Sequence, residues 1–239
     1  MIDFNIEKII PLCSEFGVEI TPKIKERLNL YGNLLIEWNQ KINLTAITEP
    51  EEVLFKHFYD CILFFKNTNV PMGATVIDVG TGAGFPGLVL KIIREDLKVT
   101  LLDSLNKRIT FLNDVINQLK LTDITTVHSR AEEGGQNKLY REKYDIACAR
   151  AVASMPVLLE YCTPFVKIGG MFIAMKGPSV NDEIALCNKA LKELSMEKPT
   201  IICETLTGDE QRAFVCFKKI SQTPPKYPRN SGKIAKQPL

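Results

Sequence analysis

The first 65 residues carry apolar side chains at helical spacing. After Thr21-Pro22, a cap followed by a proline suited to the first helical position, apolar residues recur every three or four positions. This stripe consists of Ile24, Leu28, Tyr31, Leu35, Trp38 and Ile42. Thr48-Glu49-Pro50-Glu51 matches a capping box and predicts a second helix, which runs to about residue 65. Because an amphipathic stripe must be buried, we expect residues 1–66 to form a helical extension packed on the domain that follows.

From about residue 70 the pattern changes to short apolar runs that alternate with helical stretches. Strands are predicted at residues 75–79, 99–103, 125–128, 145–149, 171–175, 200–203 and 213–217. Helices are predicted between them, among others at residues 107–119, 155–166 and 181–194. This alternation predicts an α/β domain with a parallel sheet and helices on both faces.

The last two predicted strands are joined only by ETLTGDEQR, which is too short for a crossover helix. They should therefore pair antiparallel. A seven-stranded, mostly parallel sheet with a reversed last hairpin is typical of the Rossmann-like class I methyltransferase fold. We assign residues 67–220 to a domain of this type.

Past Ile220 the sequence SQTPPKYPRNSGKIAKQPL is rich in proline and basic residues, and it predicts a flexible basic tail over residues 221–239. From Arg212 to the end there are seven basic residues and no acidic one, whereas residues 1–65 carry ten acids against six bases. The net charge of +2 is too small to indicate nucleic acid by itself. The uneven distribution fits a polyanion that is contacted on one side, and a solvated tail explains it equally well.

The composition adds few constraints. Hydrophobic residues make up 45% and charged residues 24%, so most of the chain should fold. The seven cysteines form no CxxC pair, which favours reduced thiols in a cytoplasmic protein over disulfides or a zinc site. The N-terminus does not have the pattern of a signal peptide, and the long apolar region at residues 70–93 is interrupted by an aspartate and by four glycines from Gly80 to Gly87. We expect no bound metal, no membrane contact and, by default, a monomer.

The stretch VIDVGTGAGFPGLVLKII contains the strongest chemical signal. Residues 82–87 satisfy GxGxxG between a strand and a helix, a motif shared with dinucleotide enzymes. Asp78, two residues before Gly80, favours a positively charged ligand such as a sulfonium, although a carboxylate that caps the turn explains it too. Asp103, at the end of the second strand, is placed to accept hydrogen bonds from ribose hydroxyls, which fits NAD and S-adenosylmethionine equally. Taken together, the loop favours S-adenosylmethionine.

Five motifs follow one another along the chain: DVGTGAGFPG, TLLDSLNKRITFL, SRAEE, ARAVAS and MKG. With them the sequence resembles, over nearly its whole length, the RsmG (GidB) family of bacterial 16S ribosomal RNA guanine-N7 methyltransferases. The resemblance implies methyl transfer from S-adenosylmethionine to N7 of a guanine in the 530 loop of 16S rRNA, acting on the free RNA or on the 30S subunit.

The resemblance also implies roles for individual residues. Gly80 and Phe85, with Gly82 and Gly84 of the same loop, would contact the cofactor, Ala131 and Glu132 would flank its adenine, and Arg150 matches a binding arginine of the family. Alternatives remain for two of them, because Glu132 could simply begin a helix and Arg150 could pair with Asp78 or Glu132. The expected RNA contacts are Arg130, Lys107, Arg108, Lys176 and, in the tail, Lys226, Arg229 and Lys233.

The chemistry requires little from side chains. Guanine N7 has a lone pair and no proton, so we expect no general base and catalysis by positioning alone. The sequence lacks a (D/N)PPY motif after the fourth strand and any Pro-Cys pair, and its two histidines, His57 and His128, are too few for a histidine-based metal site. Two rivals stay open: an NAD(P)-dependent oxidoreductase, and a non-catalytic ribosome-binding module that has kept the fold.

Overall fold

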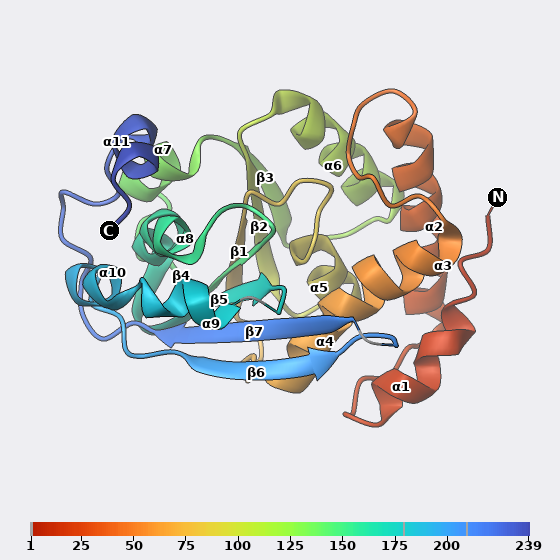
Figure 1. Cartoon of the computed structure of the whole chain (residues 1–239). Helices are drawn as coiled ribbons and strands as arrows, with labels where there is room; N and C mark the ends of the chain where they lie inside the picture. Colours follow the sequence, from red (N-terminus) through yellow and green to blue (C-terminus); the bar gives the residue numbers. More distant parts are fainter. Residues whose placement is uncertain (1, 179, 209) are drawn as a thin grey trace.

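The computed structural model describes residues 2–178, 180–208 and 210–239, and in these ranges seven strands form one central sheet (Figure 1). The strands are β1 (Thr75–Val79), β2 (Lys98–Asp103), β3 (Ile124–His128), β4 (Tyr144–Arg150), β5 (Val166–Lys176), β6 (Thr200–Thr205) and β7 (Gln211–Lys218). Their order is β3-β2-β1-β4-β5-β7-β6. Strands β1 to β5 are parallel, and β7 runs antiparallel to both β5 and β6. The predicted fold class and its reversed last hairpin are confirmed.

The strand order reverses at β1, which pairs with β2 on one side and with β4 on the other. In open α/β sheets, ligands bind beyond the carboxyl ends of the strands at such a switch point. Strands β1, β2 and β4 end at Val79, Asp103 and Arg150. The three segments that the sequence marked as chemically informative therefore leave the sheet at the same edge.

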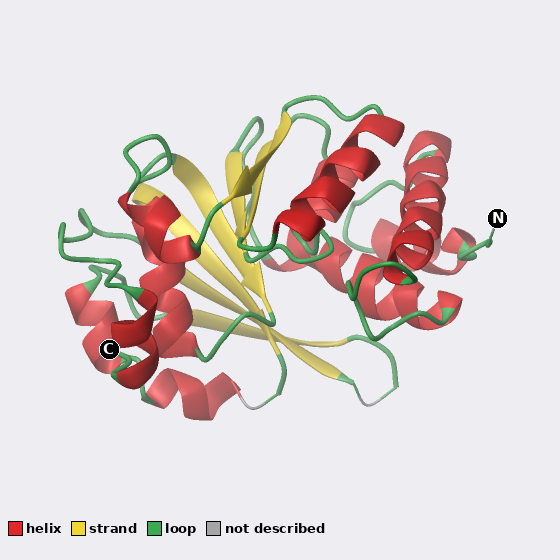
Figure 2. Ribbon diagram, turned by 90° about the horizontal axis from the view of Figure 1, so that it is seen from above, coloured by secondary structure: helices red, strands yellow, loops and turns green. Residues whose placement is uncertain are grey.

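Helices cover both faces of the sheet (Figure 2). One face carries α4 (Asp60–Asn67), α5 (Gly87–Ile93) and α6 (Asn106–Gln118), and the other carries α7 (Ala131–Gln136), α8 (Met155–Cys162), α9 (Val180–Ala185), α10 (Asn188–Glu193) and α11 (Ser231–Lys236). Side chains of each strand alternate between the two cores, as Val76 and Ile77 of β1 illustrate.

The predicted N-terminal helices form a second layer over α5 and α6. Helix α2 (Pro22–Asn39) begins where Thr21 accepts a hydrogen bond from the Ile24 N–H, as its Thr-Pro start predicts, and η1 (Ile6–Ile9) and α1 (Ile10–Ser14) precede it. The next helix starts at Pro50 without the predicted capping box, because Glu49 occupies the cap position and no side chain caps the helix. It runs through α3 (Pro50–Glu52), the π-helical segment η2 (Val53–Tyr59) and α4. A π turn changes the direction of the side chains that follow, and such turns often lie at functional sites.

Two predicted helices differ from those observed. The helix expected over residues 155–166 ends at Cys162, and a 3-10 turn η3 (Thr163–Phe165) leads into β5, because Pro164 lacks the N–H that would continue the helix. The single helix expected over residues 181–194 is divided into α9 and α10.

The C-terminal segment, expected to be flexible, is packed against α7 and α8. Thr223, Tyr227, Ile234 and Leu239 are buried. The Arg141 guanidinium donates to the carbonyl oxygens of Thr223 and Tyr227, each at 2.8 Å. Prolines lack a backbone N–H, so the carbonyl oxygens of this segment accept hydrogen bonds from side chains that are distant in sequence. The residues of the segment itself therefore do not indicate that it is ordered.

The remaining expectations concern thiols and membranes. The seven cysteines are free, and five of them are buried. In the described ranges, no helix has both the length and the apolar composition that a membrane span needs.

Candidate functional site

Three adjoining hollows lie along the carboxyl edge of the sheet among the described residues. The first, about 300 Å³, lies between the end of β2 and α7 and is lined by Asp103, residues 129–132 and Tyr161. The second, about 190 Å³, lies over the glycine loop and is lined by residues 80–83 and Phe85. The third, about 360 Å³, lies between the end of β5 and the helical extension and is lined by His57, Asp60, Lys176 and Arg212. The loop between α2 and α3 also lines two of the hollows, the second through Leu44 and Thr45 and the third through Ile47. The helical extension therefore helps to form the candidate site.

Two glycines of the loop serve the hollows directly. Gly80 has a φ of +71° and a Cβ there would lie 2.9 Å from the Val152 side chain. Gly82 has a φ of +61°, and its N–H donates to Asp103 at 2.9 Å. Both backbones lie in the left-handed region that favours glycine.

Gly84 has a different role from the one expected. It lines none of the three hollows, and a Cβ at this position would lie 2.9 Å from the Tyr31 hydroxyl oxygen. That hydroxyl donates to the carbonyl oxygen of Ala83. Gly84 therefore lets α2 approach the loop and hold it in place.

Asp78 also differs from a ligand-facing carboxylate. It is fully buried and lines none of the hollows. Its Oδ2 accepts hydrogen bonds from the Thr81 hydroxyl at 2.6 Å and from the Gly87 N–H at 2.8 Å. Burial raises the pKa of Asp78 to about 6. This is the turn-capping arrangement that the sequence left as the alternative, so Asp78 shapes the loop from beneath.

Asp103 occupies the predicted position at the first hollow. Its Oδ2 accepts from Gly82 and from Arg108 at 3.2 Å, and its Oδ1 accepts from the Leu105 N–H at 2.9 Å. A carboxylate oxygen can accept two hydrogen bonds, so Oδ1 retains capacity toward the hollow. Arg108, expected to contact RNA, instead pairs with Asp103, and its buried Nε has no hydrogen-bond partner among the described residues.

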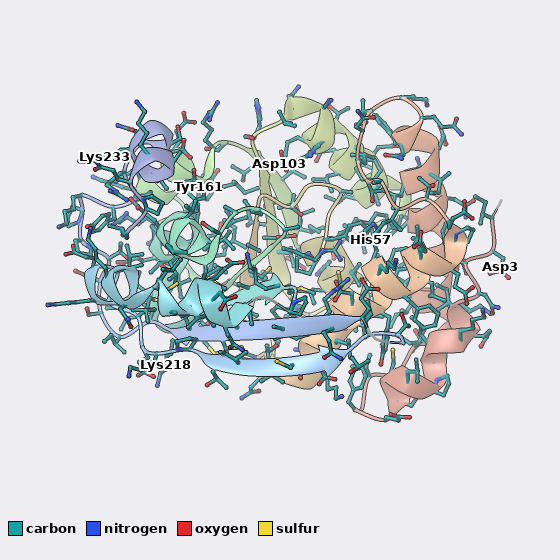
Figure 3. The ribbon with its side chains drawn as sticks, viewed as in Figure 1. Asp3, His57, Asp103, Tyr161, Lys218 and Lys233 are labelled. Carbon is teal, nitrogen blue, oxygen red and sulfur yellow. The ribbon has the colours of Figure 1, made fainter. Side chains whose placement is uncertain are left out.

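Ala131 and Glu132 line the opposite wall of the first hollow, at the start of α7. Tyr161 of α8 completes this wall, and burial raises the pKa of its hydroxyl. Asp103 and Tyr161 lie on the same side of the molecule in Figure 3. Tyr161 was not predicted, because it is embedded in the apolar helix LLEYC and its pattern is that of an ordinary core residue.

Arg150 joins the end of β4 to the helical extension. Its guanidinium donates to Asp60 Oδ2 and to the Lys56 carbonyl, each at 2.9 Å, and lies 4.8 Å from the centre of the Phe85 ring. The ion pair foreseen with Asp78 or Glu132 is thus made with Asp60. Arg212 approaches the same carboxylate at 3.2 Å, so one buried aspartate holds two arginines at the wall of the third hollow.

His57 is stacked on Phe85, with 4.4 Å between ring centres. Its Nδ1 lies 3.1 Å from an Arg150 guanidinium nitrogen and 3.1 Å from the Lys56 carbonyl oxygen, and its Nε2 lies 2.9 Å from the Thr45 hydroxyl oxygen. Burial and, next, the charge of Arg150 lower the pKa of His57 to about 3, which keeps the ring neutral. The other histidine, His128, is exposed at the end of β3.

Several cations expected to contact RNA have partners within the protein. Lys176 pairs with Glu183 at 2.8 Å and donates to the Ala153 carbonyl at 3.0 Å. Lys226 pairs with Glu193, and Arg229 pairs with the buried Glu160.

Three other cations that were expected to contact RNA are exposed to solvent. Arg130, Lys107 and Lys233 are exposed and have no ion pair in the described part of the chain. Among the described residues, no group of three or more His, Cys, Asp or Glu side chains is placed to hold a metal ion.

A sheet in this order, with a glycine loop after β1 and an aspartate ending β2, defines a class I methyltransferase fold. It is similar to a SAM-dependent methyltransferase from Aquifex aeolicus, with a TM-score of 0.52 and 18% identity over 76% of this chain and 97% of that one. It is also similar to precorrin-6y C5,15-methyltransferase from Geobacter metallireducens, with a TM-score of 0.52 and 12% identity over 74% of this chain and 92% of that one.

The sequence comparisons are more specific. The family model of rRNA small subunit methyltransferase G, GidB, matches residues 24–214. The chain is 52% identical over 235 residues to ribosomal RNA small subunit methyltransferase G of Acetivibrio thermocellus, covering 97% of this chain and 95% of that protein. It is 50% identical over 228 residues to the protein of the same name from Clostridium botulinum strain Loch Maree, covering 95% of both. The chain belongs to the rRNA small subunit methyltransferase G family.

Proposed function

We propose that the protein transfers a methyl group from S-adenosylmethionine to N7 of a guanine in the 530 loop of 16S rRNA. Membership of the family makes it a methyltransferase of small-subunit rRNA that depends on S-adenosylmethionine. The observation that carries the finer proposal is the row of three adjoining hollows. They offer successive places for a nucleoside, for the methionine part of the donor and for an acceptor base.

The first hollow has the chemistry that a nucleoside needs. Asp103 has acceptor capacity for ribose hydroxyls, and the Glu132 carboxylate accepts no hydrogen bond from another described side chain. The second hollow, with Gly80, Gly82 and Phe85, would hold the methionine part against the backbone of the loop. When bound, S-adenosylmethionine supplies an electrophilic methyl group on a positively charged sulfur.

The third hollow is the candidate for the acceptor base. It is separated from the second by Arg150 and His57, which line both. Both ring nitrogens of His57 are engaged in hydrogen bonds, so this wall offers a rigid neutral surface and no free base. Guanine N7 holds no proton, so the role of these residues is to orient the base and to exclude water.

The RNA itself would be held by phosphate contacts from exposed cations at the same side of the molecule. Arg130 borders the first hollow, and Lys233 of α11 lies on the side where Asp103 and Tyr161 lie in Figure 3. Such contacts provide affinity without base specificity. We infer that the substrate is 16S rRNA or the 30S subunit, and that the protein acts as a monomer in the cytoplasm.

Transfer of labelled methyl groups from S-adenosylmethionine to 30S subunits that lack the modification tests the proposal, followed by mapping of the labelled nucleotide. We expect one labelled guanine, with its label at N7, in the 530 loop. Label at another nucleotide would refute the assignment of the target. Binding to 30S subunits without transfer would favour the non-catalytic module, and stabilisation by NADH in place of S-adenosylhomocysteine would favour the oxidoreductase.

A further inference from the structure

Ala151 is the residue that the three hollows share. Gly80 and Arg108 line the first and second, His57 and Arg150 line the second and third, and Ala151 lines all of them. It therefore lies at the junction where the nucleoside, loop and acceptor hollows meet.

The backbone at this junction is unusual. Ala151 has a φ of +55°, in the left-handed region that side chains other than glycine rarely adopt. The chain bends over residues 151–153, with Arg150 paired to Asp60 at the third hollow and Val152 close to Gly80 at the first.

The turn is anchored on both sides, which explains how the left-handed conformation persists. Val152 lies close to Gly80 of the glycine loop. The Lys176 ammonium donates to the carbonyl oxygen of the next residue, Ala153, at 3.0 Å. Glu183 accepts the Met155 N–H at 2.6 Å. Strained backbone of this kind is retained where the surroundings fix it and is concentrated at functional sites. Lys176, which is half-buried, thus helps to hold this turn in place.

We propose that Ala151 sets the clearance between the methyl donor and the acceptor base, and that a side chain larger than its methyl group closes the junction. This positioning role rests on the proposed function. Asp103 and Tyr161, which would contact the adenosyl part of the donor, line only the first hollow, whereas Ala151 lines all three. A bulkier residue at position 151 should therefore obstruct the approach of the base while leaving the nucleoside in place. Displacement of reacting atoms by about 1 Å is enough to lower a transfer rate by roughly 100-fold.

A series of substitutions separates side-chain size from backbone conformation. Asn tolerates the left-handed region but is larger than Ser, which tolerates it less well. If size decides, transfer to 30S subunits falls in the order Ala151→Gly, wild type, Ala151→Ser, Ala151→Asn and Ala151→Leu. The Leu variant should lose about 100-fold or more in kcat, with its Kd for S-adenosylhomocysteine changed less than about threefold.

The matched control is Ser195→Leu, which places the same side chain at another left-handed position, φ +59°, outside the three hollows. It should transfer methyl groups at the wild-type rate. Transfer by Ala151→Asn at the rate of Ala151→Gly would show that the backbone decides and would overturn the proposal. So would full activity of Ala151→Leu, or a parallel loss of S-adenosylhomocysteine binding. Absence of transfer by the unchanged protein would refute the proposed function, and the role of Ala151 with it.

Discussion

Arg229 and Glu160 form a bidentate ion pair that ties the C-terminal segment to helix α8. Arg229 Nε and its backbone N–H both donate to Glu160 Oε1 at 2.8 Å, and the second guanidinium nitrogen pairs with Oε2. Glu160 is completely buried, so the arginine is its only source of compensating charge among the described side chains. The residue next to it, Tyr161, lines the first hollow. The segment is thus part of the structure that supports the first hollow.

Replacing Arg229 should destabilise the fold rather than weaken RNA binding alone. Arg229→Met leaves a buried carboxylate unpaired, which costs about 3–5 kcal/mol of the free energy of unfolding. Urea denaturation measures this change. Lys226→Met, which breaks the exposed pair with Glu193, is the control and should change stability little. Equal stability of the two variants would contradict the structural role of Arg229.

The contribution of α11 to RNA binding should appear in its salt dependence. Lys233 and Lys236 are exposed and bonded to no acidic side chain among the described residues. Removing both with Lys233→Ala and Lys236→Ala should lower the slope of log K against log salt by roughly 1.5, since each phosphate contact contributes about 0.7–0.9. Lys218→Ala, on a different side of the molecule in Figure 3, should leave the slope unchanged. If the slope falls equally in the double variant and in Lys218→Ala, the RNA is attracted by the overall charge of the protein and α11 makes no specific contact.

Asp103 should be essential for binding the cofactor. Asp103→Asn replaces an acceptor oxygen with a donor opposite the N–H of Gly82 or Leu105, and it weakens acceptance from ribose hydroxyls. Hydrogen bonds to a charged group contribute about 1.5–3 kcal/mol, so affinity for S-adenosylhomocysteine should fall roughly 10- to 100-fold. Isothermal titration calorimetry measures it. Asp96→Asn, at a surface pair with Arg94, should bind normally. If the Asp103 variant binds S-adenosylhomocysteine with unchanged affinity, Asp103 does not contact the cofactor.

His57 should make the fold sensitive to mild acid. Its pKa is about 3 in the folded protein, below the ordinary value of 6.5, so the unfolded chain binds the proton more readily. The stabilisation from the neutral ring is therefore complete above pH 6.5 and is lost progressively as the pH falls toward 3. The loss amounts to about 1.4 kcal/mol for each pH unit below 6.5.

Comparison with His57→Gln isolates this effect. Asp78, whose folded pKa is raised to about 6, gives the opposite trend, because the folded state holds its proton between pH 6 and 4. Asp78 is present in both proteins and cancels in their difference. The difference in the free energy of unfolding between wild type and His57→Gln should decrease from pH 7 to pH 5. A constant gap would mean that His57 is not buried as described.

The fold was predictable because it rests on local patterns. Alternating apolar runs located the strands, and the short link before β7 predicted its reversal. The positions of Asp103 and Glu132 beside the first hollow were predictable, because Asp103 ends β2 and Glu132 follows β3 at the carboxyl edge of the sheet.

The rest of the site depends on partners distant in sequence. Arg150 meets Asp60 across 90 residues, and the π turn that directs His57 toward it has no sequence signature. The same limit applies to charges, since nothing near Arg229 in the chain indicates that its partner is Glu160.

The place of β7 in the sheet has a consequence for synthesis. This last strand lies between β5 and β6, and not at the edge. Until it has emerged from the ribosome, β5 has an unpaired edge and β6 has no neighbour in the sheet. Chains that stop before residue 211 would leave an open edge on β5 and β6 without a partner strand, which favours aggregation. Premature termination near the C-terminus should therefore yield insoluble fragments in place of a shortened enzyme.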